Sequence, residues 1–453
     1  IGAAVIAAWS LTRWFTTRLR ITPRDVQLRT GLLRRQNLST ARDRIRTVDV
    51  TAHLLHRVLG LGRVVVGTGN IERGGKGALV LDGLLIGDAE RLRDDLLHRG
   101  QPTSNITADE PEPARTRTEL ARLNRRWIGY APFTLSGVLT GVVLWGFYWR
   151  IQGESGVDLT RYRLIRSLRD WFTGLSTATA VLVVVAAVVL FIVITSTAGY
   201  VLAFWNFRLV RDDGGTLQVT RGLLTTRATS IERRRLVGVQ ISEPLLLRAV
   251  GAGRVLAVAT GLRVGRGAER GGEILLPPAP MDEVRRTSGE VLDDATVPTA
   301  ALHRHPPAAR RRHLFRAITG GLIVAAVALG LVWVVESAVP PPWLVLTVAV
   351  VSLAASAALG RDRYASLGHA MADGYLLTGQ GSVVRRRSVV HTDAVIGWNF
   401  RSTYFQRRLG LVTAVATTAA GRQGYSVVDT DPRTALELAE RVNGDVVGQF
   451  RST

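Results

Sequence analysis

Residues 222–251 read GLLTTRATSIERRRLVGVQISEPLLLRAVG, a stretch that begins and ends with glycines 29 positions apart. The same spacing occurs three times in the chain, at Gly31 and Gly60, at Gly222 and Gly251, and at Gly381 and Gly410. Each copy continues into another strand-like run and then a helical run, and long apolar segments separate the copies. Self-similarity of this kind is typical of a repeat protein. The sequence therefore predicts one small domain present three times, with these glycines at structural turns.

The first two copies agree position by position. The matched residues are Arg42 and Arg44 with Arg233 and Arg235, and Gly62, Arg63 and Val64 with Gly253, Arg254 and Val255. The third copy diverges, because Ala394 replaces the second of these basic residues. It also gains aromatic residues at Trp398, Phe400, Tyr404 and Phe405. We therefore expect the three copies to share a fold and to differ in what they bind.

Within each copy the hydrophobic pattern predicts several strands and one closing helix. In the first copy, apolar residues alternate with polar ones around Val48 and Val50, and further strands are predicted at 63–66 and 78–81. A helix follows over 88–98, with Asp88 as its N-cap. The last helix of the chain is predicted to begin at Asp431 and Pro432. The domains are placed at 19–100, 207–295 and 363–445, here called repeats 1, 2 and 3.

Composition indicates an integral membrane protein. Of the 453 residues, 47% are hydrophobic, and the mean hydropathy is positive. The net charge of +22 comes almost wholly from arginines dispersed along the chain, without stacking aromatics on the same element, so no nucleic-acid partner is expected. The absence of cysteine excludes disulfides, thiol catalysis and thiolate metal sites.

Long apolar segments predict membrane-spanning helices, each needing about 20 residues. They are placed at 127–149 and 175–205, which form one hairpin, and at 317–335 and 343–360, which form a tighter one. Residues 1–15 resemble the end of a truncated spanning helix. The segment 159–172 has the amphipathic pattern of a helix lying in the membrane interface, and 101–126 and the basic stretch 296–313 are predicted to be linkers.

An even number of spans between successive repeats places all three repeats on one side of the membrane. Arginines flank the spans on the repeat side, including Arg208 and Arg361, whereas the turn at 336–342 has none. Because positive residues favour the inner face, the repeats are expected to be cytoplasmic in a multi-pass cell-membrane protein.

Motifs that could carry chemistry are incomplete. Gly74, Gly75, Lys76 and Gly77 lack both the first glycine and the hydroxyl residue of a phosphate-binding loop. His303, His305 and His313 could bind a metal, but no carboxylate accompanies them at helical spacing, and a solvated linker is the preferred interpretation. No catalytic residue, cofactor or metal is therefore expected.

These residues resemble the bacterial pleckstrin-homology-like domains of YdbS/YdbT-type membrane proteins. The resemblance rests on a strand that ends in glycine, on basic strands such as Arg44-Ile45-Arg46-Thr47-Val48, and on Leu59-Gly60-Leu61 and Leu409-Gly410-Leu411. It covers essentially the whole chain and departs from the pattern at Ala394 and at residues 250–252. It implies a multi-domain membrane protein in which transmembrane hairpins alternate with three α+β domains, each a bent antiparallel sheet capped by a C-terminal helix. The resemblance implies no ligand.

Two functions of different class remain open. In the first, the repeats form a non-enzymatic scaffold or adaptor for a membrane-associated protein in the cell envelope, bound through the aromatic surface of repeat 3. The candidate residues for this binding are Trp398, Phe405, Arg407 and Arg408, unless these aromatics are only core. In the second, anionic membrane lipids are bound by Arg42, Arg44, Arg233 and Arg235, unless these arginines only reflect the positive-inside bias.

Overall fold

The structure is a computed structural model of the chain. It describes residues 18–22, 25–30, 36–41, 47–52, 59–67, 79–97, 117–134, 136, 140–143, 146, 150, 167, 171, 174–261, 273–336 and 341–448. Several predictions lie outside these residues: the helix end at 1–15, Gly31, Arg42 and Arg44, the first part of the linker 101–126, and most of the interfacial helix 159–172.

Repeat 1 is built from strands followed by one helix. The elements are β1 (Arg18–Ile21), β2 (Asp25–Thr30), β3 (Gln36–Ala41), β4 (Thr47–Ala52), β5 (Leu61–Gly67), β6 (Leu79–Leu85) and α3 (Ile86–Leu97). The strands predicted at 63–66 and 78–81 are therefore confirmed. The alternation of apolar and polar residues in these strands has the expected cause. Val48, Val64 and Val66 are fully buried and pack with Leu92 of the helix.

The closing helix of repeat 1 begins two residues before Asp88, so the N-cap predicted at Asp88 is wrong. The chain passes directly from β6 into α3, and the Ile86 N–H donates to the carbonyl of Gly60 at 2.9 Å. In repeat 2 the Met281 N–H likewise donates to the carbonyl of Gly251 at 2.9 Å. Both glycines have a φ of +68°, which favours glycine. A turn carbonyl therefore holds the first residue of each of these helices.

Repeat 2 begins earlier than its predicted boundary. Residues 117–122, predicted as linker, form β7, which pairs antiparallel with β8 and buries Leu120 and Ala121. The elements of this region are β7 (Arg117–Arg122), the 3₁₀ helix η2 (Arg125–Thr134), α6 (Thr177–Phe204), β8 (Arg208–Asp212), β9 (Leu217–Arg221), β10 (Thr226–Ile231), η4 (Arg233–Arg235), β11 (Leu236–Pro244), α7 (Leu245–Ala249), β12 (Ala252–Ala259), β13 (Ile274–Pro280), α8 (Met281–Leu292) and η6 (Val297–Thr299).

Repeat 3 follows a helical hairpin and has the same order of elements. They are α9 (Pro307–Glu336), α10 (Pro342–Ala365), β14 (Gly368–Ala372), β15 (Tyr375–Gln380), β16 (Val384–His391), η7 (Thr392–Ala394), β17 (Val395–Arg401), α11 (Tyr404–Arg408), β18 (Val412–Thr418), β19 (Gly424–Thr430) and α12 (Pro432–Gly448). The predicted start of the last helix is confirmed, because the side chain of Asp431 accepts a hydrogen bond from the Arg433 N–H at 2.7 Å.

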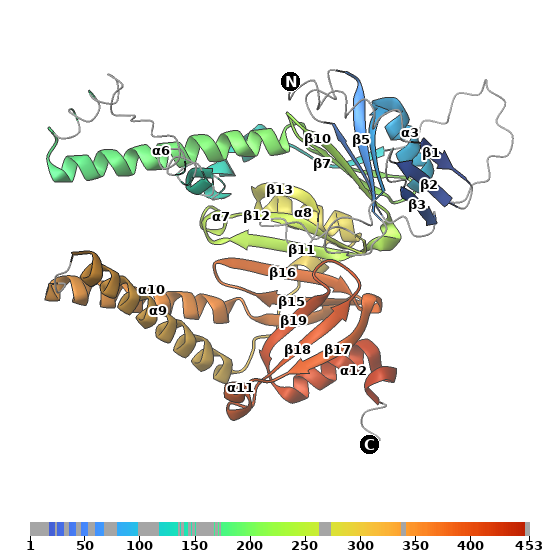
Figure 1. Cartoon of the computed structure of the whole chain (residues 1–453). Helices are drawn as coiled ribbons and strands as arrows, with labels where there is room; N and C mark the ends of the chain where they lie inside the picture. The colour runs from blue at the N-terminus through green and yellow to red at the C-terminus, as the bar shows by residue number, and fades with distance from the viewer. Residues whose placement is uncertain are drawn as a thin grey trace.

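The sheets continue from one repeat into the next (Figure 1). Strand β4 of repeat 1 pairs with β10 of repeat 2, which gives a seven-stranded sheet in the order β6-β5-β4-β10-β9-β8-β7. Strand β11 of repeat 2 pairs with β16 of repeat 3, which gives a six-stranded sheet in the order β13-β12-β11-β16-β15-β14. Two three-stranded sheets remain at the ends, β1-β2-β3 and β17-β18-β19.

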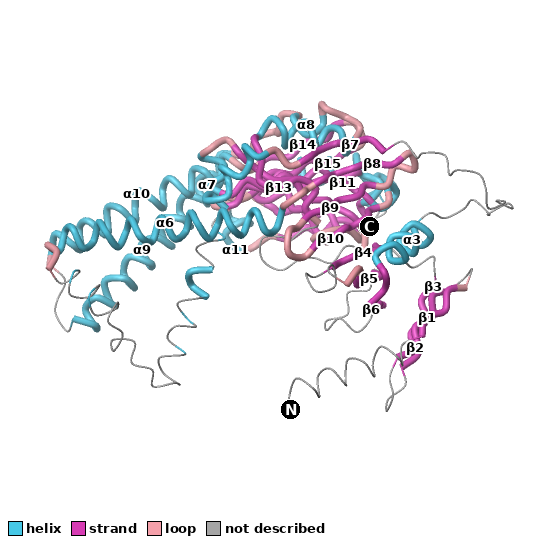
Figure 2. The backbone as a smooth tube through the Cα atoms, turned by 90° about the horizontal axis from the view of Figure 1, so that it is seen from above, coloured by secondary structure: helices cyan, strands magenta, loops and turns pink. Residues whose placement is uncertain are grey.

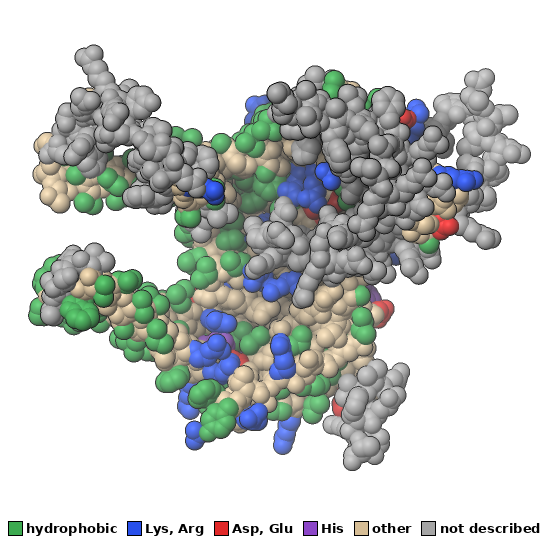
Figure 3. All heavy atoms as spheres, in the orientation of Figure 1, with side chains coloured by type: hydrophobic (Ala, Val, Ile, Leu, Met, Phe, Trp, Pro, Cys, Tyr) green, Lys and Arg blue, Asp and Glu red, His purple; other side chains and the backbone are tan. Residues whose placement is uncertain are grey.

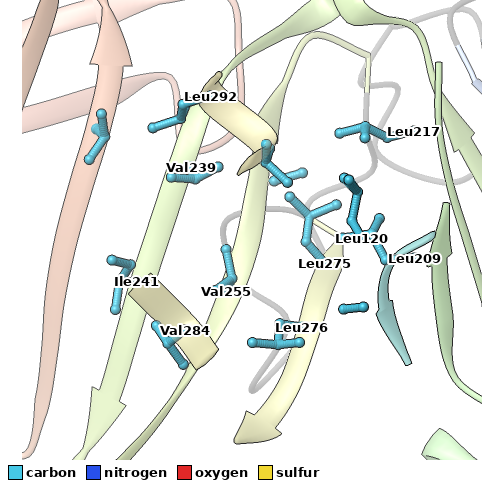
Figure 4. Packing of buried hydrophobic residues seen from close by; sticks show 14 of the residues in the cluster. Leu120, Leu209, Leu217, Val239, Ile241, Val255, Leu275, Leu276, Val284 and Leu292 are labelled. Atoms are coloured by element: carbon cyan, nitrogen blue, oxygen red, sulfur yellow. The ribbon is translucent and has the colours of Figure 1, made fainter. Parts of the chain in front are cut away.

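The largest hydrophobic core also crosses a repeat boundary. Its residues include Val239, Ile241 and Val255 of repeat 2, together with Leu275 and Val284 (Figure 4). The same cluster contains Ala370, Leu377 and Val389 from repeat 3. Repeats 2 and 3 therefore bury apolar surface against each other and form one packed body, which is stabilised mainly by the hydrophobic effect.

Among the described residues, three helices are long and apolar enough to span a bilayer: Thr177–Phe204, Pro307–Val334 and Pro342–Ala365. All three project from the same side of the sheets (Figures 1 and 2). The fourth predicted span, at 127–149, is wrong in its first turns. Residues up to Thr134 form η2, in which Trp127 and Ala131 are buried in the protein. The remainder of that span is described only at scattered positions.

Candidate functional site

Two arginines predicted to face lipid, Arg233 and Arg235, are paired within their own domain. Arg233 forms an ion pair with Asp293. Arg235 is only 12% exposed, and its Nε lies 3.0 Å from Glu232 Oε2. Burial of Asp293 raises its pKa, but hydrogen bonds and charge from Arg211 and Arg233 outweigh this effect and lower it. Both arginine charges are thus compensated inside the molecule.

The position of η4 also argues against lipid contact by these arginines. Strand β11 runs from η4 to α7, over nine residues or about 30 Å. Helix α7 lies at the end of the sheet from which the apolar helices project (Figure 1). The arginines of η4 therefore lie at the opposite end, and this geometry does not support the lipid-facing role predicted for Arg233 and Arg235.

The aromatic residues of repeat 3 divide between a strand and a helix. Trp398 and Phe400 lie on β17 with their rings stacked at 6.3 Å. Trp398 is half-buried against the core of repeat 3, and within the described part of the chain its Nε1 has no hydrogen-bond partner. Phe400 is 40% exposed. The alternative interpretation, that these aromatic residues only form the hydrophobic core, therefore applies in part to Trp398 and poorly to Phe400.

Phe405, Arg407 and Arg408 lie on α11, two residues beyond β17. Phe405 is 65% exposed, and both arginines are exposed. The helix is short but well capped, because Thr403 and Gln406 form a reciprocal capping box. The guanidinium of Arg408 lies over the ring of Tyr404 at 5.8 Å. The four predicted partner-binding residues thus lie on two consecutive elements, Trp398 on β17 and the other three on α11.

A buried carboxylate joins this helix to the base of the second hairpin. Asp429 of β19 is fully buried, pairs with Arg312 and lies 3.0 Å from His313 Nε2. Its other oxygen accepts a hydrogen bond from Gln406 Nε2 at 2.5 Å. Burial raises the pKa of Asp429, but these donors prevail and lower it to about 2. Asp429 therefore holds α9, α11 and β19 together as one unit.

The stretch 296–313, predicted as a solvated linker, is largely packed against repeat 3. His305 and His313 are buried, and His303 pairs through its backbone with His369 of β14. His305 Nδ1 donates to the carbonyl of Val428 at 2.7 Å, so its Nε2 accepts from His369 Nδ1 at 3.1 Å. Burial lowers the pKa of both imidazoles, to about 4 for His369. The prediction of a solvated linker is wrong because the segment covers the edge of β14.

Three of these histidines, His303, His305 and His369, border a cavity of about 570 Å³, which is also lined by Arg304, Glu437 and Arg441. Within the described residues no group of three or more histidine, cysteine or carboxylate side chains has a geometry that could hold a metal ion. The spacing of the histidines in the sequence left a metal site open, but His305 and His369 contact each other and a backbone carbonyl as hydrogen-bonded packing residues. The sequence contains no signal that would have paired them with His369 and Asp429.

Comparison with known proteins identifies the class to which this fold belongs. The profile of the bacterial PH domain family matches residues 1–100 and 165–293, about half of the chain, including repeat 1 and nearly all of repeat 2. The chain therefore belongs to the bacterial PH domain family, as a membrane protein with helices long enough to span a bilayer. This confirms the predicted pleckstrin-homology-like class.

A curated relative places the chain more closely. The UPF0699 transmembrane protein YdbT of Bacillus subtilis (strain 168) is 24% identical over 276 residues, which cover 58% of this chain and 54% of that protein. The chain spans about half the length of this relative. The resemblance to YdbT-type proteins is thus confirmed. No solved structure matches the chain.

Proposed function

We propose that this membrane protein is a non-catalytic scaffold or adaptor of the cell envelope. Its three PH-like domains alternate with the membrane hairpins along the chain and lie on the cytoplasmic side of the membrane. Repeat 3 binds a protein partner. The observation that carries the proposal is the outer edge of β17, which among the described strands pairs only with β18 and exposes apolar side chains. An unpaired edge offers backbone hydrogen bonds to an incoming strand, and its side chains select that strand.

The β17 edge is held at a fixed place relative to the membrane helices. Asp429 links the first turns of α9 to α11, and α11 directly follows β17. Arg248 of α7 and Arg385 of β16 both contact Asp362, near the end of α10. A partner bound at β17 would therefore be positioned close to the membrane surface, which is what a membrane-held adaptor requires.

The test is site-specific photocrosslinking in cells that express the full chain. A photoreactive phenylalanine analogue at Phe400 should crosslink a protein, because this side chain is 40% exposed on the open strand. The matched control is the same analogue at Leu436 of α12, which is also 40% exposed but lies on a helix. Crosslinks from position 400 and not from 436 support the proposal. An absence of crosslinks from position 400 contradicts it.

A second candidate, contact with anionic lipid, is favoured at α11 and not at the arginines first predicted. The exposed side chains of Tyr404, Phe405, Arg407 and Arg408 lie beside the base of α9, where Phe315 is exposed as well. Hydrophobic and basic side chains lie together near this end of the molecule in Figure 3. Aromatic rings favour the membrane interface, and each arginine near an anionic surface contributes about 1 kcal/mol.

Lipid contact at α11 can be tested with a fluorophore, because the natural chain has no cysteine. A polarity-sensitive dye on Phe405→Cys should shift to the blue in nanodiscs that contain phosphatidylglycerol, compared with phosphatidylcholine alone. The same dye on Leu436→Cys serves as the control. Equal spectra in the two lipids at position 405 contradict the lipid candidate.

A further inference from the structure

The two joins between repeats have the same strand register. Val48 of β4 pairs with Ser230 of β10, and Val239 of β11 pairs with Val389 of β16. Val239 follows Val48 by 191 residues and Val389 follows Ser230 by 159, which are the offsets that separate the glycines of successive repeats. The join is therefore a repeated structural unit in which the second sheet of one repeat receives the first sheet of the next.

Strand β17 occupies the receiving position in repeat 3, and among the described strands none pairs with its outer edge. Ile396 corresponds to Val237, which is 9% exposed because it packs with Val390 and other residues of repeat 3. Ile396 itself is 67% exposed. Phe400 corresponds to Ile241, which is 2% exposed, whereas Phe400 is 40% exposed. Strand β17 therefore has apolar residues at the positions of the join, but no described strand packs over them.

A glycine gives independent support. At Gly238 of β11 an added Cβ would lie 1.9 Å from the carbonyl oxygen of Val389, so the approach of β16 requires glycine there, whereas the first join has Thr47 at the equivalent position of β4. The corresponding residue of β17 is Gly397, where the nearest atom to an added Cβ is Thr417 Oγ1 at 3.7 Å. Repeat 3 thus has the glycine that admits an incoming backbone, although no described strand occupies that space.

The strand that would enter such a join lies in repeat 1, and one of its edges is unpaired among the described strands. Strand β3 of repeat 1 corresponds to β10 and β16, the strands that enter the two internal joins, and Ser39 stands at the position of Ser230 and Val389. Among the described strands β3 pairs only with β2. The chain therefore carries one receiving edge and one entering edge of the same interface.

We propose that β17 of one molecule pairs with β3 of a second copy of this chain, in the register of the two internal joins. Trp398 then lies opposite Ser39, and Arg401 opposite Gln36. This inference rests on the proposed binding role of β17 and names its occupant. The interface is heterologous, so it extends head to tail and ends only by closing into a ring. The internal joins leave α6, α9 and α10 on one side, and the same join between molecules keeps all spans in one membrane.

Disulfide trapping tests the register in membranes, because every thiol is an introduced one. Two differently tagged full-length chains are co-expressed, one with Arg401→Cys and the other with Gln36→Cys, and oxidised. Residues directly opposite in an antiparallel pair have Cβ atoms about 5 Å apart, close enough to form a disulfide after small movements. We expect a disulfide-linked pair carrying both tags. Asn37→Cys in place of Gln36→Cys should give little product, because a one-residue shift turns the side chain to the other face.

The second part of the experiment adds Gly397→Ala to the chain that carries Arg401→Cys. An added methyl group meets nothing closer than 3.7 Å within the molecule but blocks the incoming backbone, so the disulfide yield should fall at least tenfold while the melting temperature stays unchanged. Gly444→Ala, where a Cβ meets no atom within 4 Å, should leave the yield intact. Equal trapping from positions 36 and 37, or no trapping at all, overturns the inference. If trapping fails while Phe400 still crosslinks another protein, the adaptor proposal stands alone; if both fail, neither stands.

Discussion

At the scale of single residues, the decisive contacts are those that compensate buried charge. Asp429 is fully buried, and Arg312, His313 and Gln406 surround its two oxygens. A carboxylate in such a place is stabilised only by its partners, because burial alone opposes ionisation. Arg221 and Glu273 form a similar buried pair at 2.7 Å in repeat 2. Such pairs depend on geometry and leave little trace in a sequence in which arginine is abundant.

The first prediction concerns Asp429→Asn. Removing one member of a buried ion pair leaves the other charge uncompensated, so the free energy of unfolding should fall by roughly 3 kcal/mol in detergent. Asp393→Asn, at an exposed carboxylate beside His391, should change it by less than about 0.5 kcal/mol. Denaturant titration of the two purified variants provides the measurement, and equal effects would show that the Asp429 cluster is not stabilising.

The same carboxylate predicts a pH dependence. Because the pKa of Asp429 is lowered from 3.8 to about 2, its contribution to stability is present above pH 3.8 and is lost as the pH falls through 2. The difference in unfolding free energy between the natural chain and Asp429→Asn should therefore shrink between pH 4 and pH 2. A difference that stays constant over this range would contradict the assignment.

At the scale of elements, the glycines determine how closely strands can approach. Gly222 and Gly381 have φ values of +113° and +108°, and an added Cβ at either would lie 2.1 Å from a backbone oxygen of the same turn. These positions demand glycine for local reasons, and their spacing is visible in the sequence. Gly238 demands glycine for a different reason, the approach of β16 from the next repeat, and nothing in its neighbourhood in the sequence reveals this.

This contrast predicts different outcomes for equivalent substitutions. Gly238→Ala forces β11 and β16 apart and should lower the free energy of unfolding by about 2 kcal/mol, as overpacked cores do. Gly397→Ala, at the equivalent position of β17, should leave it unchanged in the monomeric chain. Thermal unfolding of both variants in dilute detergent is the measurement, and similar losses would indicate that β17 is already paired.

At the scale of the whole molecule, the sheets and the spanning helices form one arrangement. Edge-to-edge pairing places the repeats in a row, and the apolar helices leave this row on the same side (Figure 1). The spanning helices are therefore well separated from η4. A row with one receiving and one entering edge is suited to assembly along a membrane.

The proposed orientation can be measured by cysteine labelling in intact cells. Ala338→Cys, between α9 and α10 in the sequence, should react with a membrane-impermeant maleimide added outside. Asp213→Cys, at an exposed site between β8 and β9, should react only after the cells are opened. Labelling of position 213 in intact cells would reverse the orientation and place the repeats outside.

Much of the architecture follows from the sequence because it depends on local pattern. Repetition, the strand and helix order, three of the spans and the class of domain all rest on periodicity and composition within short windows. The burial of His305 and His313, the pairing of Arg233 with Asp293, and β7 within a predicted linker do not follow, since each depends on a neighbour far along the chain. The join of β11 to β16 connects residues about 150 positions apart. The sequence by itself determined what the repeats are; the tertiary structure decided how they pair, and which edges stay open, because strand pairing is a contact between distant segments.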